Sequence, residues 1–122
     1  TSLCHSISYP LTAHFGLPHG LACAFTMPAV MRHNLSADDG RFERLARVLL
    51  PNEAGKPETL LDHFDAFNQQ LNVAEQVRDL IGSLESLIAL RGEMITTGRA
   101  DNSLATIDDK TLKSVLRQAW SQ

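Results

Sequence analysis

The stretch His5-Ser-Ile-Ser-Tyr-Pro-Leu-Thr-Ala-His-Phe-Gly-Leu-Pro-His19 decides how the start of this 122-residue chain folds. One unbroken helix would hold its two terminal histidines about 21 Å apart, at roughly 1.5 Å per residue. Pro10 disfavours helical geometry at the residue before it, so we expect a helix to end at Tyr9. Pro18 suits the first turn of a helix and places His19 at that helix's start. A helix, a reversing loop and a second helix can therefore bring the two rings to one point.

A point where two imidazoles meet suits a divalent metal ion, because imidazole nitrogen is a good ligand for zinc and ferrous iron. Two ligands alone make a poor metal site, so the alternative is that both histidines are ordinary polar residues at helix ends. Cys4 adjoins His5, but adjacent helix residues point about 100° apart, so we do not expect Cys4 to reach the same ion. Cys23 lies in an apolar helix and is expected in the core.

The spacing of apolar residues predicts helices in almost every other segment. From Pro18 to about Asn34 the chain is apolar nearly all round, which indicates the central helix of a bundle. Pro28 should kink this helix, because it lacks the amide that would bond back one turn. Ser36, with Asp39 three residues later, has the pattern of a capping box that opens the next helix.

The later part of the chain carries similar signals. Pro57 suits the first turn of a further helix, and Ser83 and Asp108 are the expected N-caps of two more. The residues expected to face the core are Phe42, Leu45, Ala46 and Leu49, then Leu60, Leu61, Phe64, Phe67 and Leu71, and finally Leu112, Val115, Leu116 and Ala119. No segment alternates with the period of a strand. We therefore expect one all-α domain over residues 1–122, a bundle of about six or seven helices.

Composition sets limits on function. With 43% hydrophobic residues the chain can bury a core, and its formal net charge of −3 argues against nucleic-acid binding, which needs a basic face. No apolar run approaches the roughly 20 residues of a membrane-spanning helix, so no membrane partner is expected. The chain starts at Thr1 without a signal-peptide pattern, and we expect it to be the middle of a longer protein.

Two strings, Cys4-His-Ser-Ile-Ser-Tyr-Pro-Leu and Phe15-Gly-Leu-Pro-His-Gly-Leu-Ala-Cys-Ala-Phe-Thr-Met-Pro28, resemble the metal-binding segment of the iron-containing (group III) alcohol dehydrogenases. That family carries a histidine, then a Pro-Leu, then a Pro-His-Gly that opens a long helix running to a proline. The resemblance implies that the two family ligand histidines fall on His5 and His19. It also implies the C-terminal helical domain of these enzymes, which is dehydroquinate synthase-like.

A weaker similarity lies near the end of the chain. Gly98-Arg-Ala-Asp-Asn-Ser resembles the turn before the family's last helix, and Asp108 to Trp120 resembles that helix. Arg99 in this turn could pair with an anionic substrate group through its planar guanidinium. The alternative is that Asp101 and the asparagine after it only shape the turn through bonds to the backbone.

The resemblance also suggests residues for proton transfer and substrate contact. Many family members carry a second histidine four residues after the first ligand, and it is thought to assist proton transfer. This chain has Tyr9 there, whose hydroxyl can relay a proton or form a hydrogen bond. We expect His14 in the loop between the ligands, which lines the active-site cleft of the family. The alternative is that His14 is simply exposed to solvent.

The function that the resemblance implies is the metal-site half of a cytoplasmic, metal-dependent NAD(P)-linked alcohol dehydrogenase or aldehyde reductase. The metal would be Fe2+, with Zn2+ or Mn2+ as alternatives. The family's other two ligands and its Gly-rich loop lie upstream, and this chain has no Gly-x-Gly run, so NAD or NADP would bind mainly to another domain. The isolated chain is expected to be inactive, and an uncovered apolar face should make it a homo-oligomer.

The substrate is expected to be a small alcohol or aldehyde. The string that starts at Cys4 looks closest to a branch of the family associated with phosphonate metabolism, whose substrate is phosphonoacetaldehyde. The alternative function is a stand-alone helical interaction module without catalytic activity, because two ligands of four hold a catalytic metal poorly.

Overall fold

The structure is a computed structural model that describes residues 2–95 and 102–122. Its helices are α1 (Leu3–Phe15), α2 (His19–Leu35), α3 (Arg41–Leu49), α4 (Pro57–Gln70), α5 (Val73–Ile81), α6 (Leu84–Ala89), α7 (Arg91–Met94) and α8 (Asp109–Trp120). These eight helices, with no strand among the described residues, confirm the all-α prediction. The number is slightly higher than expected because α6 and α7 are short and follow each other closely.

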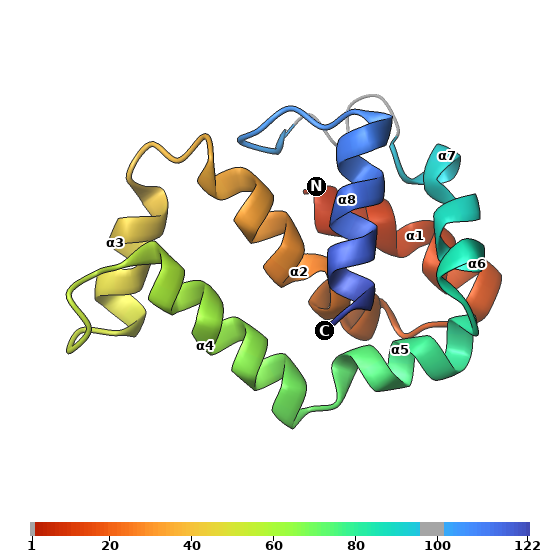
Figure 1. The fold of residues 1–122 in the computed structure, drawn as a ribbon, viewed down its shortest axis with the longest axis horizontal. Coiled ribbons are helices and arrows are strands. Elements are labelled where there is room, and N and C mark those ends of the chain that lie inside the picture. Colours follow the sequence, from red (N-terminus) through yellow and green to blue (C-terminus); the bar gives the residue numbers. More distant parts are fainter. Residues whose placement is uncertain (1, 96–101) are drawn as a thin grey trace.

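The helix α2 is the centre of the fold. It packs most extensively against α1, and it also contacts α8, α4 and α5 (Figure 1). The main apolar cluster lies between these helices and includes Ile7, Phe25 and Leu116, none of which is exposed. A second, smaller cluster lies where α3 and α4 extend to one side of the molecule, and Phe42 and Leu60 belong to it.

The helix α1 does not end before Pro10, and that prediction is wrong. The helix continues through this proline to Phe15. A proline inside a helix costs roughly 3 kcal/mol, whereas full burial of a Leu or Ile side chain contributes about 1.5–3 kcal/mol. Ile7 and Leu11, which flank Pro10 on the buried side, are both 0% exposed. Their burial together outweighs the local penalty, so the helix persists.

The chain reverses between α1 and α2 within the three residues Gly16–Pro18. Gly16 takes a left-handed backbone, with a φ of 67°, and its N–H donates to the carbonyl of Thr12 at 3.0 Å. Leu17 is fully buried and fixes the turn against the core. Pro18 is the N-cap of α2, so the helix begins at His19 as the sequence predicts.

Pro28 lies inside α2, which continues to Leu35. This proline has no N–H to donate to the carbonyl of Ala24 one turn earlier. The buried side chain of Asn68, on α4, donates to that carbonyl instead, with 2.7 Å between Nδ2 and the oxygen. The replacement keeps the carbonyl satisfied and ties α4 to α2, so the proline is tolerated. The kink expected at Pro28 stays a prediction.

The capping box predicted at Ser36 and Asp39 is wrong. Ser36 is the C-cap of α2, and its hydroxyl donates to the carbonyl of His33 at 2.9 Å. The next helix, α3, begins only at Arg41, and Asp38 accepts a hydrogen bond from the N–H of Phe42 at 3.2 Å. A polar run of this kind offers several capping residues, and in the structure Asp38, not Ser36, contacts the first turn of α3.

The two other predicted caps are confirmed. Ser83 opens α6 and accepts a hydrogen bond from the N–H of Ser86 at 3.1 Å. Asp108 opens α8 and accepts from the N–H of Thr111 at 2.7 Å. Pro57 stands in the first turn of α4, as expected.

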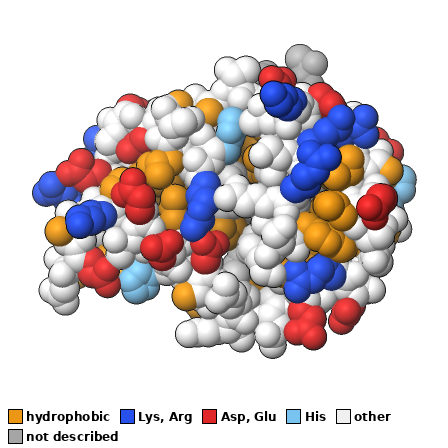
Figure 2. Space-filling view, in the orientation of Figure 1, with side chains coloured by type: hydrophobic (Ala, Val, Ile, Leu, Met, Phe, Trp, Pro, Cys, Tyr) orange, Lys and Arg blue, Asp and Glu red, His pale blue; other side chains and the backbone are white. Residues whose placement is uncertain are grey.

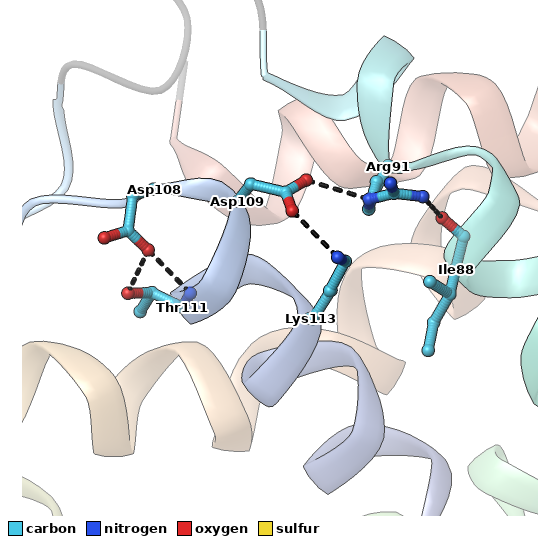
Figure 3. Close-up of polar contacts among 6 residues, drawn as sticks. All are labelled: Ile88, Arg91, Asp108, Asp109, Thr111 and Lys113. Atoms are coloured by element: carbon cyan, nitrogen blue, oxygen red, sulfur yellow. Dashed lines mark hydrogen bonds and ion pairs between the residues drawn. The ribbon is translucent and has the colours of Figure 1, made fainter.

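The start of α8 is also tied to the preceding helices (Figure 3). Hydrogen bonds from the hydroxyl and the N–H of Thr111 lower the pKa of Asp108. A hydrogen bond from Lys113, and a second from Arg91, lower the pKa of Asp109. Because Arg91 belongs to α7, its contact with Asp109 at 2.8 Å joins α7 to α8.

The apolar stripes of α3 and α4 are buried only in part, which corrects the sequence prediction. Leu45, Leu49, Phe67 and Leu71 are 41–56% exposed. These side chains lie outside the smaller cluster that α3 and α4 share with Met31 and Leu35 of α2, so they are left partly exposed on the side of the molecule where α3 and α4 lie (Figure 1). Hydrophobic side chains show between charged ones of both signs on this face (Figure 2).

None of the helices in residues 2–95 and 102–122 combines the length and apolar character needed to cross a bilayer.

The turn between α1 and α2 can be tested with two glycines that differ in backbone conformation. A Cβ at Gly16 would meet no atom within 4 Å, so only its left-handed backbone opposes a substitution. We expect Gly16→Ala to lower the free energy of unfolding by about 1–2 kcal/mol.

The matched control is Gly20→Ala. A Cβ at Gly20 would also meet no atom within 4 Å, but the backbone of this glycine is helical. This variant should be neutral or up to about 1 kcal/mol more stable. Urea unfolding of both variants measures the difference, and equal effects would show that the turn does not depend on the left-handed glycine.

Candidate metal centre

The structure brings His5 and His19 together. His5 lies in the first turn of α1 and His19 is the first residue of α2, yet their ring centroids are 5.3 Å apart with an angle of 50° between the planes. The segment Gly16–Pro18 leads the chain back from the end of α1, so that α2 begins beside Ser8, within one turn of His5. The rings are close enough for one ion to contact a nitrogen of each.

Cys23, which was expected in the core, adds a third donor atom to this pair. Sγ of Cys23 lies 3.7 Å from Nε2 of His19. This sulfur and one ring nitrogen each of His5 and His19 all lie within 4.8 Å of one another. Cys23 follows His19 by four residues, and that spacing places both side chains on the same face of α2. The spacing was the signal in the sequence that could have identified Cys23.

A buried serine orients the ring of His19. The hydroxyl of Ser8, which is 0% exposed, donates to the carbonyl of His5 at 2.8 Å and lies 3.1 Å from Nδ1 of His19. A hydroxyl has one hydrogen, so with that hydrogen on the carbonyl it must accept from Nδ1–H. Nε2 of His19 then carries the lone pair, and it points toward Cys23. Partners of this kind fix the tautomer of metal-binding histidines.

Tyr9 flanks the same ring. Its side chain stacks on His19, with 5.9 Å between ring centroids and 24° between the planes. Tyr9 is 43% exposed, so it forms an outer wall of the cluster and faces solvent. The structure therefore places Tyr9 beside the candidate metal ligands.

His14 lies elsewhere. It belongs to the last turn of α1, which corrects its expected position in a loop, and its Nε2 contacts the carboxylate of Glu93 at 2.9 Å. Nine residues of helix separate it from His5, so it lies about 13 Å further along and on the opposite side. Because α1 continues past Pro10, His14 is carried away from the cluster.

Cys4 is not part of the cluster, in agreement with the sequence analysis. Burial raises the pKa of its thiol to about 11, so the thiolate that metals bind is disfavoured. The two polar residues considered near the end of the chain, Arg99 and Asp101, lie outside the described residues.

The donor chemistry of the cluster fits a transition metal. Two imidazoles and a thiol suit zinc and iron, whereas magnesium, calcium and manganese prefer oxygen ligands. His19 is exposed and Cys23 half-buried, so the cluster opens to the surface. Three groups from this chain would leave one position of a four-coordinate ion, or two of a five-coordinate ion, for ligands from elsewhere.

Comparison with known proteins decides the family. The model of the Fe-containing alcohol dehydrogenase family, C-terminal, matches residues 1–120. The chain belongs to this family. The residues that match include both histidines of the cluster and the turn that joins them.

Similar proteins from this family are oxidoreductases of small molecules. The chain is 50% identical over 40 residues to phosphonoacetaldehyde reductase from Streptomyces viridochromogenes, a match that covers 33% of the chain and 10% of that protein. It is 25% identical over 122 residues to 1,3-propanediol dehydrogenase from Citrobacter freundii, covering 95% of the chain and 31% of that protein. It is 28% identical over 93 residues to lactaldehyde reductase from Escherichia coli, a match that covers 72% of the chain and 24% of that protein. The chain thus spans less than a third of the length of these relatives.

The orienting role of Ser8 gives a testable prediction. Ser8→Ala removes the acceptor for Nδ1–H of His19, and loss of such a partner typically costs 10–100-fold in metal affinity. We expect the affinity of the chain for Zn2+ to fall by about that factor, measured by competition with a chromophoric chelator.

The matched control is Ser6→Ala in the same helix. The hydroxyl of Ser6 is buried and has no hydrogen-bond partner among the described residues, so its removal should leave zinc affinity unchanged. Equal affinities for both variants would contradict the assignment of Ser8.

Proposed function

We propose that this chain supplies the metal-holding helical part of a metal-dependent, NAD(P)-linked alcohol dehydrogenase or aldehyde reductase. The observation that carries this proposal is the convergence of His5 and His19 across the turn at Gly16, in a chain that matches the C-terminal model of the family. The proposed metal is Fe2+, with Zn2+ or Mn2+ as alternatives. NAD or NADP would bind mainly to a domain outside these 122 residues.

His5 and His19 would each offer one ring nitrogen to the metal, and further ligands would come from the nucleotide-binding domain. The exposure of His19 supports this arrangement, because a second domain and a substrate can both reach its ring. Bound there, the metal would supply Lewis-acid polarisation of the alcohol or carbonyl oxygen while hydride passes to or from the nicotinamide.

The chain's own residues would orient the ligands and handle the proton. Ser8 keeps a proton on Nδ1 of His19, which leaves Nε2 as the ligand atom. Tyr9 is proposed to relay a proton or hydrogen-bond to substrate, and its stacking on His19 supports that role. A catalytic role for His14 has less support, because the residue pairs with Glu93 on the far side of α1.

The proposed substrates are small alcohols or aldehydes. The match of 50% identity over 40 residues favours the phosphonoacetaldehyde branch, since it is higher than the identities to the other two relatives. We further propose a cytoplasmic homo-oligomer, without nucleic-acid or membrane partners. The half-exposed Leu49 and Phe67 support association, because apolar patches of this kind drive contacts between copies.

The function is tested by replacing a ligand in the enzyme assembled from this chain and its nucleotide-binding domain. We expect His19→Ala to lower kcat/KM for aldehyde reduction by about 1,000-fold or more. Metal polarisation contributes several kcal/mol, and each 1.36 kcal/mol is a factor of ten in rate.

The control is His63→Ala, an exposed histidine of α4 that contacts Glu53 and should leave kcat/KM unchanged. If both variants retained full activity, His19 would not be a ligand. An intact assembly that bound metal but oxidised or reduced no small alcohol or aldehyde with either nicotinamide would favour the interaction module.

A further inference from the structure

We propose that Cys23 is a third metal ligand from this chain, so that His5, His19 and Cys23 together bind a thiophilic divalent ion such as Zn2+ or Co2+. This inference rests on the proposed metal centre and adds to it a sulfur donor and a preference among metals. It also means that the chain can hold an ion by its own residues.

The separations between the donor atoms support a shared ion. Around a tetrahedral ion, with bonds of about 2.0–2.1 Å to nitrogen and 2.3 Å to sulfur, neighbouring donor atoms lie roughly 3.3–3.6 Å apart. The observed 3.7 Å between Sγ of Cys23 and Nε2 of His19 is close to this range. All three donors lie within 4.8 Å of one another, so side-chain rotation is enough to close the set.

The backbone holds these donors in place. His19 and Cys23 are one turn apart on the same face of α2, so the helix itself fixes their spacing. Ser8 fixes the tautomer of His19, because its hydroxyl accepts a hydrogen bond from Nδ1–H of that ring. The lone pair is then on Nε2, which faces the sulfur of Cys23. The first turn of α1 holds His5 beside this pair, with its ring centroid 5.3 Å from that of His19.

The thiol has no strong competing partner among the described contacts. Besides His19, Sγ of Cys23 approaches the carbonyl of Cys4 at 3.9 Å, which is a weak hydrogen bond. When the metal–sulfur bond forms, the thiol proton leaves to solvent and this weak bond is given up. Cys23 is half-buried, so an ion can reach it from the open side of the cluster.

A sulfur ligand changes which metals bind well. Thiolate donors favour zinc and similar soft or borderline ions, whereas manganese prefers oxygen. A site with two imidazoles and one thiolate should therefore bind Zn2+ and Co2+ more tightly than the two histidines alone would. Its affinity for Mn2+ should depend little on the sulfur.

The test is a Co2+ titration of the 122-residue chain under a phosphine reductant, followed by absorption spectroscopy. A cobalt–thiolate bond gives a charge-transfer band in the near ultraviolet that histidine ligands do not give. We expect this band in the unsubstituted chain, and we expect Cys23→Ser to lose it and to bind Zn2+ at least about 10-fold more weakly. Mn2+ affinity should change by less than about twofold.

The matched control is Cys4→Ser, which removes the chain's other thiol next to His5 and should keep the band. Retention of the band in Cys23→Ser, its loss in Cys4→Ser, or its absence from the unsubstituted chain would overturn the proposal. If the unsubstituted chain bound cobalt without the band and His19→Ala abolished that binding, the sulfur ligand would be wrong and the histidine pair would stand. Activity of His19→Ala in the assembled enzyme tests the proposed function separately.

Discussion

The candidate metal centre depends on the left-handed backbone of Gly16. With this residue the chain turns from α1 to α2 within three residues, and the first turns of α2 pack against the first turns of α1, with His19 beside Ser8 and Cys23 beside Cys4. A longer or looser connection would let α2 slide or rotate, and a rotation of one residue, about 100°, would point His19 away from His5. Leu17, fully buried in the main apolar cluster, holds the turn against the core. The position of the ligands is thus a consequence of packing at the first helical hairpin.

Ser8, Tyr9 and Cys23 surround the ring of His19 on different sides. The hydroxyl of Ser8 links the backbone of α1 to the ring of His19, so the orientation of one ligand follows the helix that carries the other. Tyr9 covers the outer side of this ring, and Cys23 lies beneath it on the next turn of α2. The cluster remains open on one side. The matches to this chain cover less than a third of each of the three relatives. An opening on this side agrees with a site completed by groups from another part of such a longer protein.

The sequence predicted the elements that depend on neighbouring residues. The caps at Ser83 and Asp108 involve residues three apart, and the start of α2 follows from Pro18, so local chemistry determines them. The length of α1 could not be predicted in this way, because burial outweighs the local preference of Pro10. The error displaced His14 from the predicted loop to the far end of a helix.

Two further features required the three-dimensional packing. Periodicity shows that α3 and α4 each have an apolar face, but it does not show whether another helix covers that face, so the exposure of Leu49 and Phe67 was missed. The meeting of His5 and His19 was expected from a chain reversal before His19, although that reversal lies at Gly16–Pro18 and not at Pro10. Cys23 was missed although its spacing of four residues from His19 is visible in the sequence, and only its approach to His5 required the packing of α1 on α2.

The central claim is that one ion lies between His5 and His19, and anomalous X-ray diffraction at the zinc absorption edge tests it most directly. In crystals of the chain grown with Zn2+, we expect a single strong anomalous peak about 2.0–2.1 Å from a ring nitrogen of each histidine. A peak bonded to only one of the two rings, or rings that face away from each other with no peak between them, would contradict the account.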